Sequence, residues 1–160
     1  MRIGTGYDSH VFEKGKRLVL CGVEIEGCDG LKAHSDGDVA IHAAIDAIFG
    51  AAALGDIGSH FPDTSPEWKG ADSAKLLEAA VAEAARAGWR VGNIDLTIVC
   101  EKPRLSPHAP AMRSRLASLL GVPESCVSVK GKTNEGMDAI GRGCGIAAHA
   151  AVLLVEYTVK

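Results

Sequence analysis

Aromatic side chains are scarce in this sequence. Phe, Trp and Tyr make up 4% of its 160 residues, too few for the base-stacking surface of a protein that binds single-stranded nucleic acid. Lys and Arg number 17 against 20 Asp and Glu, for a formal net charge of −3. No long basic run occurs, so the sequence gives no electrostatic reason to expect nucleic acid or an anionic membrane as a partner.

Paired cysteines and long apolar runs are also missing. The five cysteines are odd in number and widely spaced, with no C-x-x-C pair, which argues against a disulfide scaffold and a structural zinc knuckle. The opening MRIGTGYDSH has no apolar segment typical of a signal peptide, and His or Asp interrupts every long apolar run. We therefore expect a cytoplasmic protein of bacterial type, with reduced thiols, no transit peptide and no membrane association.

The overall composition is that of a globular domain, with 47% hydrophobic and 23% charged residues. Hydrophobic periodicity predicts a helix capped by Ser35 or Asp36, helices over 73–87 and 106–120, strands over 1–7, 89–100, 127–132 and 146–157, and a small hairpin over 17–25. The last strand is apolar on both faces, so its outer face needs a cover. We predict an α/β (α+β) fold, a single domain over residues 1–160, with a four-stranded mixed sheet. Its helices lie mainly on one face and its other face is buried in an oligomer.

The first helix and the first strand carry side chains that bind metals. Asp38, His42 and Asp46 recur every four residues, so in a helix they lie along one stripe. Asp8 and His10 point to the same side of an extended chain. Asp8, His10 and His42 are then an O,N,N ligand set with an open fourth position, as in catalytic zinc sites, and they also suit Mn²⁺ or Fe²⁺. Asp46, one turn after His42, is predicted to orient the His42 ring from outside the ligand set. Asp38 is predicted to support the ligands in the same way.

A simpler interpretation stays open at this point. A lone histidine on a half-apolar helix is more often a packed, hydrogen-bonded residue than a ligand, and Asp38 and Asp46 also fit a solvated face. Gly131-Lys132-Thr133 lacks the earlier glycine of a phosphate-binding loop. Lys132 and Thr133 therefore fit a surface lysine and a turn threonine, although at the end of a strand they can contact a phosphate.

A series of motifs, in order along the chain, gives the sequence a family resemblance. They are D-S-H at 8–10, A-H-S-D-G-D-V at 33–39 followed by His42, L-G-D-I-G at 54–58, F-P-D at 61–63, K-T-N-E at 132–135 and G-R-G at 141–143. Together they extend from the first predicted strand to the start of the last. With them the sequence resembles the 2-C-methyl-D-erythritol 2,4-cyclodiphosphate synthase family of the non-mevalonate isoprenoid route.

The resemblance implies an activity and an assembly. The protein would be a homotrimer with active sites between neighbouring subunits, acting on 4-diphosphocytidyl-2-C-methyl-D-erythritol 2-phosphate. The 2-phosphate attacks the β-phosphorus of the same molecule, which forms the cyclic diphosphate and expels CMP, so the enzyme is a phosphorus–oxygen lyase. Because nucleophile and electrophile share one molecule, the protein mainly has to fold the substrate and neutralise its charge.

The resemblance also implies which residues hold the metals. Zn²⁺, or alternatively Mn²⁺, would bind to Asp8, His10 and His42, the set that the residues themselves suggest. Mg²⁺ or Mn²⁺ would bind to Glu135 together with the diphosphate oxygens, because these hard cations take oxygen ligands and need few from the protein. These assignments give a two-metal cofactor requirement.

Further residues are implied to contact the substrate. His34 and Thr133 would be catalytic, positioning the phosphates and stabilising the transition state. The contacts to the erythritol phosphate would come from Asp8, His10, His34, Ser35, Asp56, Ile57, Gly58, Phe61, Pro62, Asp63, Thr64, Ser65, Ala139 and Arg142. The nucleotide would be held by Cys100, Glu101, Lys102, Pro103, Arg104, Leu105, Ser106, Lys132, Thr133, Asn134 and Glu135.

Two positions depart from the family pattern. Ala139 stands where some members have an aromatic residue, so looser substrate packing is expected there. Cys144 follows Arg142 and Gly143 where a glutamate is common, which makes each subunit more positive by one charge. In relatives these positions surround a cavity near the trimer axis that holds isoprenoid diphosphates, and the glutamate's loss bears on any ligand there.

Two other functions compete with the cyclising enzyme. One is a zinc phosphohydrolase in which a metal-bound water attacks. The other is a non-catalytic trimer that binds a metal or a nucleotide. Product analysis separates them, because cyclisation gives a cyclic diphosphate with CMP, hydrolysis gives linear phosphates carrying oxygen from water, and a binding protein gives no product.

Overall fold

The computed structural model describes residues 1–157. Its strands are β1 (Arg2–Leu20), β2 (Val23–Leu31), β3 (Trp89–Val99), β4 (Val127–Lys132) and β5 (Gly145–Glu156). Its helices are α1 (Val39–Ala52), α2 (Ile57–His60), α3 (Ser73–Arg86), α4 (Ala109–Leu120) and α5 (Asp138–Gly141), with 3₁₀ turns at Pro66–Trp68 and Glu124–Cys126. The strands form one mixed sheet in the order β2-β1-β5-β3-β4, with β3 parallel to β4 and the other described neighbours antiparallel.

The sheet has five strands where the sequence predicted four. The first strand does not end near Tyr7: it pairs with β5 as far as Val11 and with β2 from Phe12 onward. The stretch that joins its two halves is polar and lacks the alternation that marks a strand, so periodicity could not detect it. Backbone pairing continues through it nonetheless, with a register irregularity between Glu13 and Leu18 where the strand changes partner.

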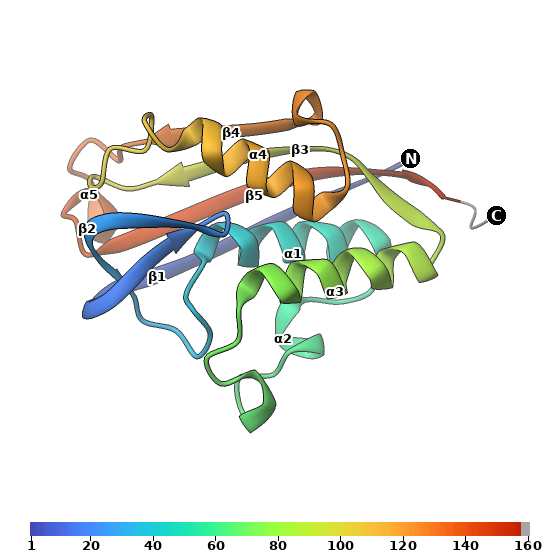
Figure 1. Ribbon diagram of the computed structural model, residues 1–160, viewed down its shortest axis with the longest axis horizontal. Helices are drawn as coiled ribbons and strands as arrows, with labels where there is room; N and C mark the ends of the chain where they lie inside the picture. Colours follow the sequence, from blue (N-terminus) through green and yellow to red (C-terminus); the bar gives the residue numbers. More distant parts are fainter. Residues whose placement is uncertain (158–160) are drawn as a thin grey trace.

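The three long helices lie on one face of this sheet, as predicted (Figure 1). Helix α3 begins after its cap Asp72, close to the predicted start, whereas α4 begins at Ala109 rather than at Ser106. Helix α1 is buried along almost its whole length because it packs between the sheet and α3. It is therefore the central helix of the core, and its position decides where His42 lies.

Two glycines let α1 approach β1 very closely. A Cβ atom at Gly4 would come within 2.0 Å of the Ala47 carbonyl oxygen, and one at Gly6 within 2.0 Å of the Ala43 carbonyl oxygen. Both contacts are far below van der Waals separation, so only glycine fits at either position. Successive even-numbered residues of β1 share this face, and the two after the glycines are Asp8 and His10.

The cap of α1 is Asp38, not Ser35 or Asp36 as the sequence predicted. Its fully buried carboxylate accepts hydrogen bonds from the amides of Ile41, Cys21 and Gly22, the last two in the turn between β1 and β2. Burial raises the pKa of Asp38 to about 6 against the lowering effect of the amides of Gly22 and Ile41. Asp38 thus supports the site by tying the hairpin to the start of the helix.

The opposite face of the sheet carries exposed apolar side chains. Ile3, Tyr7 and Val11 of β1 are 76%, 54% and 55% exposed. In register with Ile3 and Tyr7 on β5 are Leu153 and His149. Such a surface at the centre of a sheet is one that another protein surface normally covers.

In residues 1–157, the helices are all too short or too polar to cross a membrane.

Candidate metal centre and active site

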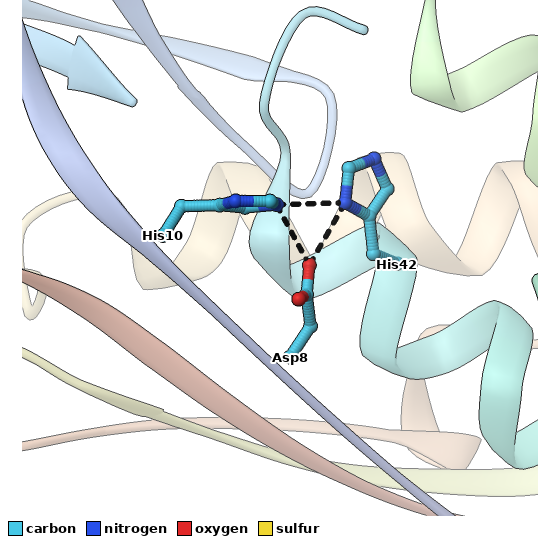
Figure 2. A group of neighbouring side chains, drawn as sticks. All are labelled: Asp8, His10 and His42. Carbon is cyan, nitrogen blue, oxygen red and sulfur yellow. Dashed lines mark hydrogen bonds and ion pairs between the residues drawn. The ribbon is translucent and has the colours of Figure 1, made fainter. Parts of the chain in front are cut away.

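Asp8, His10 and His42 converge on one point. The Asp8 Oδ2 atom lies 2.9 Å from His10 Nε2 and 2.9 Å from His42 Nδ1, and the two nitrogens are 3.2 Å apart. Figure 2 shows the two residues of β1 and the single residue of α1 pointing toward one another. The three come from segments more than thirty positions apart, brought together by the glycine contact between β1 and α1.

The spacing of these donor atoms fits a tetrahedral metal. With metal–ligand bonds of about 2.0–2.1 Å, neighbouring donors of a tetrahedral zinc site lie about 3.3 Å apart. The observed separations are slightly shorter, so a small adjustment of the side chains would seat the ion. Within residues 1–157 this is the group of His, Cys, Asp and Glu side chains whose donor atoms gather closely enough to bind a metal. The residues therefore fit the zinc that the resemblance implies.

Electrostatics also favours cation binding here. Partial burial opposes the ionisation of Asp8, but hydrogen bonds from His10 and His42 outweigh it and hold the pKa of Asp8 well below its usual range. Burial likewise works against a charged His42, yet the hydrogen bond and charge of Asp8 raise the pKa of its ring. The carboxylate is thus ionised, and a proton held by His42 in the metal-free protein must leave when a cation binds.

The far side of the His42 ring is held by two hydroxyl groups. Nε2 lies 2.9 Å from Ser73 Oγ and 3.0 Å from Ser35 Oγ. The sequence predicted Asp46 for this part, but the Asp46 carboxylate accepts a hydrogen bond from the Ile57 amide at 2.8 Å. Burial, and then the charge of nearby acidic groups, raises the pKa of Asp46. Sequence reasoning missed Ser73, since nothing in a helix-opening serine signals a contact 31 positions away.

A cavity of about 660 Å³ opens in front of the three ligands. The residues expected to contact the substrate that do line it are Asp8, His10, His34, Ser35, Ile57, Gly58, Phe61, Pro62 and Asp63. Those that do not are Asp56, Thr64, Ser65, Ala139 and Arg142. Asp56 instead caps α2, where it accepts a hydrogen bond from the Ser59 amide. Lys32, Trp68 and Leu76 also line the cavity and were not predicted.

A second cavity of about 590 Å³ lies between the loop after β3 and the end of β4. The expected nucleotide-binding residues that line it are Cys100, Glu101, Pro103, Arg104, Leu105, Ser106, Lys132 and Thr133. Lys102, Asn134 and Glu135 adjoin it in sequence. The Asn134 amide donates to Glu101 Oε1 at 2.8 Å, which ties the two loops together, and the Thr133 hydroxyl donates to Glu135 Oε1 at 3.2 Å.

The two cavities have no lining residue in common. Ser9, Ala147, Val99 and Lys132 lie in one row across β1, β5, β3 and β4, and residues directly opposite each other share a face. Lys132 therefore points away from the face that carries Asp8. At about 4.8 Å per strand, the two strands are also some 14 Å apart. One chain holds the two halves of the expected site in separate places.

Comparison with known proteins identifies the family of the chain. The model of the YgbB family matches residues 1–155. A 2-C-methyl-D-erythritol 2,4-cyclodiphosphate synthase of Alcanivorax borkumensis is 55% identical over 96% of this chain and 96% of its own. A bifunctional enzyme IspD/IspF of Anaeromyxobacter dehalogenans is 57% identical over 96% of this chain and 39% of its own.

A solved structure also has a fold very similar to that of this chain. A 2C-methyl-D-erythritol-2,4-cyclodiphosphate synthase described as a bound form with CDP has a TM-score of 0.89 and 40% identity. The similarity covers 96% of this chain and 100% of that one. Fold, motifs and length thus agree with one family over nearly the whole sequence. The chain belongs to the YgbB family, that of the 2-C-methyl-D-erythritol 2,4-cyclodiphosphate synthases.

Proposed function

We propose that this protein is an enzyme of non-mevalonate isoprenoid biosynthesis. It converts 4-diphosphocytidyl-2-C-methyl-D-erythritol 2-phosphate into 2-C-methyl-D-erythritol 2,4-cyclodiphosphate and CMP, in the cytoplasm. The observation that carries the proposal is the convergence of Asp8, His10 and His42 at a cavity, in a chain that aligns almost end to end with synthases of this name.

The residues of the first cavity suit the reacting end of the substrate. When bound, Zn²⁺ on Asp8, His10 and His42 and Mg²⁺ or Mn²⁺ near Glu135 would offset the negative charge of the phosphates. The exposed His34 and the cavity-lining Ser35 offer polar contacts to the phosphates and hydroxyl groups beside the ligands. Holding both reacting groups of one molecule together is the main catalytic task, so no acid–base pair is required.

The second cavity suits the cytidine end. Its wall combines the apolar side chains of Leu105 and Val129 with the polar ends of Lys132 and Thr133. Lys132 supplies a cation for the diphosphate and Thr133 a hydroxyl, while the loop Cys100–Ser106 offers backbone groups to the base. These contacts leave the leaving group CMP anchored while the new phosphorus–oxygen bond forms.

A homotrimer with shared active sites reconciles the two cavities. Since one chain keeps its metal-type ligands and Lys132 on different faces, the halves meet only if the first cavity of one subunit adjoins the second cavity of another. The exposed apolar row Ile3, Tyr7 and Val11 offers the surface for such an assembly.

Product analysis tests the reaction. The zinc-loaded protein, incubated with the cytidyl substrate and Mg²⁺, is expected to give one cyclic diphosphate and one CMP, seen by phosphorus NMR. Linear phosphates labelled from ¹⁸O-water would instead indicate a phosphohydrolase, and unchanged substrate would indicate a binding protein.

Mixing two inactive variants tests the shared site. Asp8→Ala disables the metal half and Lys132→Ala the nucleotide half, so each protein alone should be inactive. In trimers reassembled from equal amounts of both, about one quarter of the shared sites combine two intact halves and recover activity. A mixture as inactive as its components would show that each site belongs to a single chain.

A further inference from the structure

The metal ligand His42 is connected through its outer nitrogen to the half-buried carboxylate of Asp36. Its Nε2 atom contacts Ser73 Oγ at 2.9 Å, and Ser73 Oγ lies 2.5 Å from Asp36 Oδ1. The Ser73 amide also donates to Asp36 Oδ2, at 3.0 Å. Ser73 is fully buried and opens α3, while Asp36 belongs to the loop before α1.

The hydrogen atoms in this chain can be assigned from the chemistry of the groups. An ionised carboxylate only accepts, and a serine hydroxyl has one hydrogen to give. The Ser73 hydrogen therefore goes to Asp36, and the Ser73 oxygen is left to accept a hydrogen bond from Nε2–H of His42. In the metal-free protein Nδ1 also carries a hydrogen, which it donates to Asp8 Oδ2. Once that hydrogen leaves, the ring that keeps its hydrogen on Nε2 offers the Nδ1 lone pair to a cation held beside Asp8 and His10.

We propose that Ser73, oriented by Asp36, is the positioning residue that fixes the tautomer and ring plane of His42 for metal binding. The proposal rests on the metal site of the proposed function. Outer partners of metal-bound histidines act in this way by holding the second ring nitrogen. Here a neutral hydroxyl stands between the imidazole and the carboxylate, so no second anion sits directly on the ligand.

The same contacts hold the edge of the substrate cavity. The Asp36 amide donates to the Ala71 carbonyl at 3.0 Å, and the Gly70 amide donates to the His34 carbonyl at 2.7 Å. The loop with His34 and Ser35 is therefore fastened to the start of α3 by the segment that places Ser73. Metal ligand and cavity wall share one support.

Zinc affinity, measured by competition with a chelator, tests the proposal without any turnover. Ser73→Ala should weaken zinc binding by about 10- to 100-fold, and Ser73→Thr, which keeps the hydroxyl, should restore most of it. Ser35→Ala is the matched comparison, because Ser35 contacts the same His42 nitrogen. The other partner of its hydroxyl is the Gly37 amide, from which it accepts at 3.2 Å, whereas that of Ser73 is a carboxylate. Ser35→Ala should cost clearly less than Ser73→Ala.

Histidine ¹H–¹⁵N NMR of the zinc-loaded wild-type protein supplies a second readout that needs no variant to fold. It should show the His42 hydrogen on Nε2, hydrogen-bonded and slow to exchange. A hydrogen on Nδ1, or a Ser73→Ala protein that binds zinc within twofold of wild type, would overturn the role of Ser73 while leaving the metal site intact. A wild-type protein that binds no zinc would remove the site and this proposal together.

Discussion

The two cavities of this chain are built in different ways. The first is formed by a strand and a helix in contact through glycine, and its ligand side chains already hold one another at 2.9–3.2 Å. The second is formed by loops at the end of β3 and β4, where Lys132, Thr133 and Glu135 are all exposed. The difference indicates that the fold itself arranges the ligands of the metal half. In the proposed trimer, the nucleotide half would take its working shape only with a neighbouring subunit and the substrate.

Removal of a ligand from the prepared half should have the largest effect. His42→Ala is expected to lose bound zinc and to reduce turnover by on the order of 100-fold or more. It should keep its far-ultraviolet circular dichroism, because one buried ring is lost from an otherwise intact helix. Elemental analysis and a rate assay measure the loss. CDP binding by titration calorimetry should be preserved; if it disappears with the zinc, the two halves are not independent.

A side chain on the glycine face of β1 should damage the prepared half through the backbone. In Gly6→Ala the new Cβ meets the Ala43 carbonyl oxygen, so helix and strand must separate at a cost of about 3 kcal/mol or more. Urea unfolding measures the free energy, and zinc content should fall with it.

Gly50→Ala is the control for that variant. Gly50 is in α1, and a methyl group added there would lie an ordinary 3.9 Å from its nearest neighbour, the Thr5 carbonyl oxygen. The substitution should be neutral or stabilise the helix by up to about 1 kcal/mol. Equal losses in both variants would show that the close approach is not what holds the ligands.

A change in the nucleotide half should reduce turnover less than the loss of a metal ligand. Glu135→Gln keeps the shape of an exposed side chain but removes the charge expected to hold Mg²⁺, so turnover should fall roughly tenfold and need more Mg²⁺. Zinc content should equal that of the wild type. A variant with an unchanged Mg²⁺ dependence would remove Glu135 from the metal assignment.

The last effect concerns stability rather than turnover, at the buried cap beneath the first cavity. Asp38→Asn replaces one carboxylate oxygen by a donor that faces backbone amides, which should cost about 1–3 kcal/mol. Burial raises the folded-state pKa of Asp38 to about 6, against the hydrogen bonds from Gly22 and Ile41. This value lies above that of an unfolded aspartate, about 3.9. Folded protein therefore binds the proton more tightly, and its advantage is present at low pH and lost as the pH rises through this window.

Unfolding both proteins in urea from pH 4 to pH 7 checks this sign. The stability of the wild type relative to Asp38→Asn should decline as the pH rises from about 4 to about 6 and then stay level. A difference that grows with pH would mean that the backbone amides, rather than burial, dominate the ionisation of Asp38.

The sequence predicted the ligand set better than its supports. Asp8 and His10 share a face in any extended strand, and the motif around His42 indicated the third ligand, so the geometry could be anticipated. The supports could not, because they depend on tertiary contacts. The Asp46 carboxylate accepts a hydrogen bond from the Ile57 amide. The hydroxyl of Ser73 contacts His42 only once α3 packs on α1.

The strands and cavities show the same limit. Periodicity predicts strands whose faces differ in polarity, and it failed on the polar middle of β1, which is held by pairing with β5 and β2. The resemblance implied a set of site residues, many of which line one of the two cavities. Only the strand register revealed that Lys132 and Asp8 face opposite ways within one chain.

The antiparallel pairing of Arg2 with Leu154 places the beginning and the end of the described chain side by side (Figure 1). Asp8 lies six residues further along β1, about 20 Å away at the rise of a β-strand. An additional domain joined at either end would therefore be attached about that far from the metal ligands. The position of the ends is thus compatible with a longer polypeptide, such as the bifunctional relative of which the chain spans 39%.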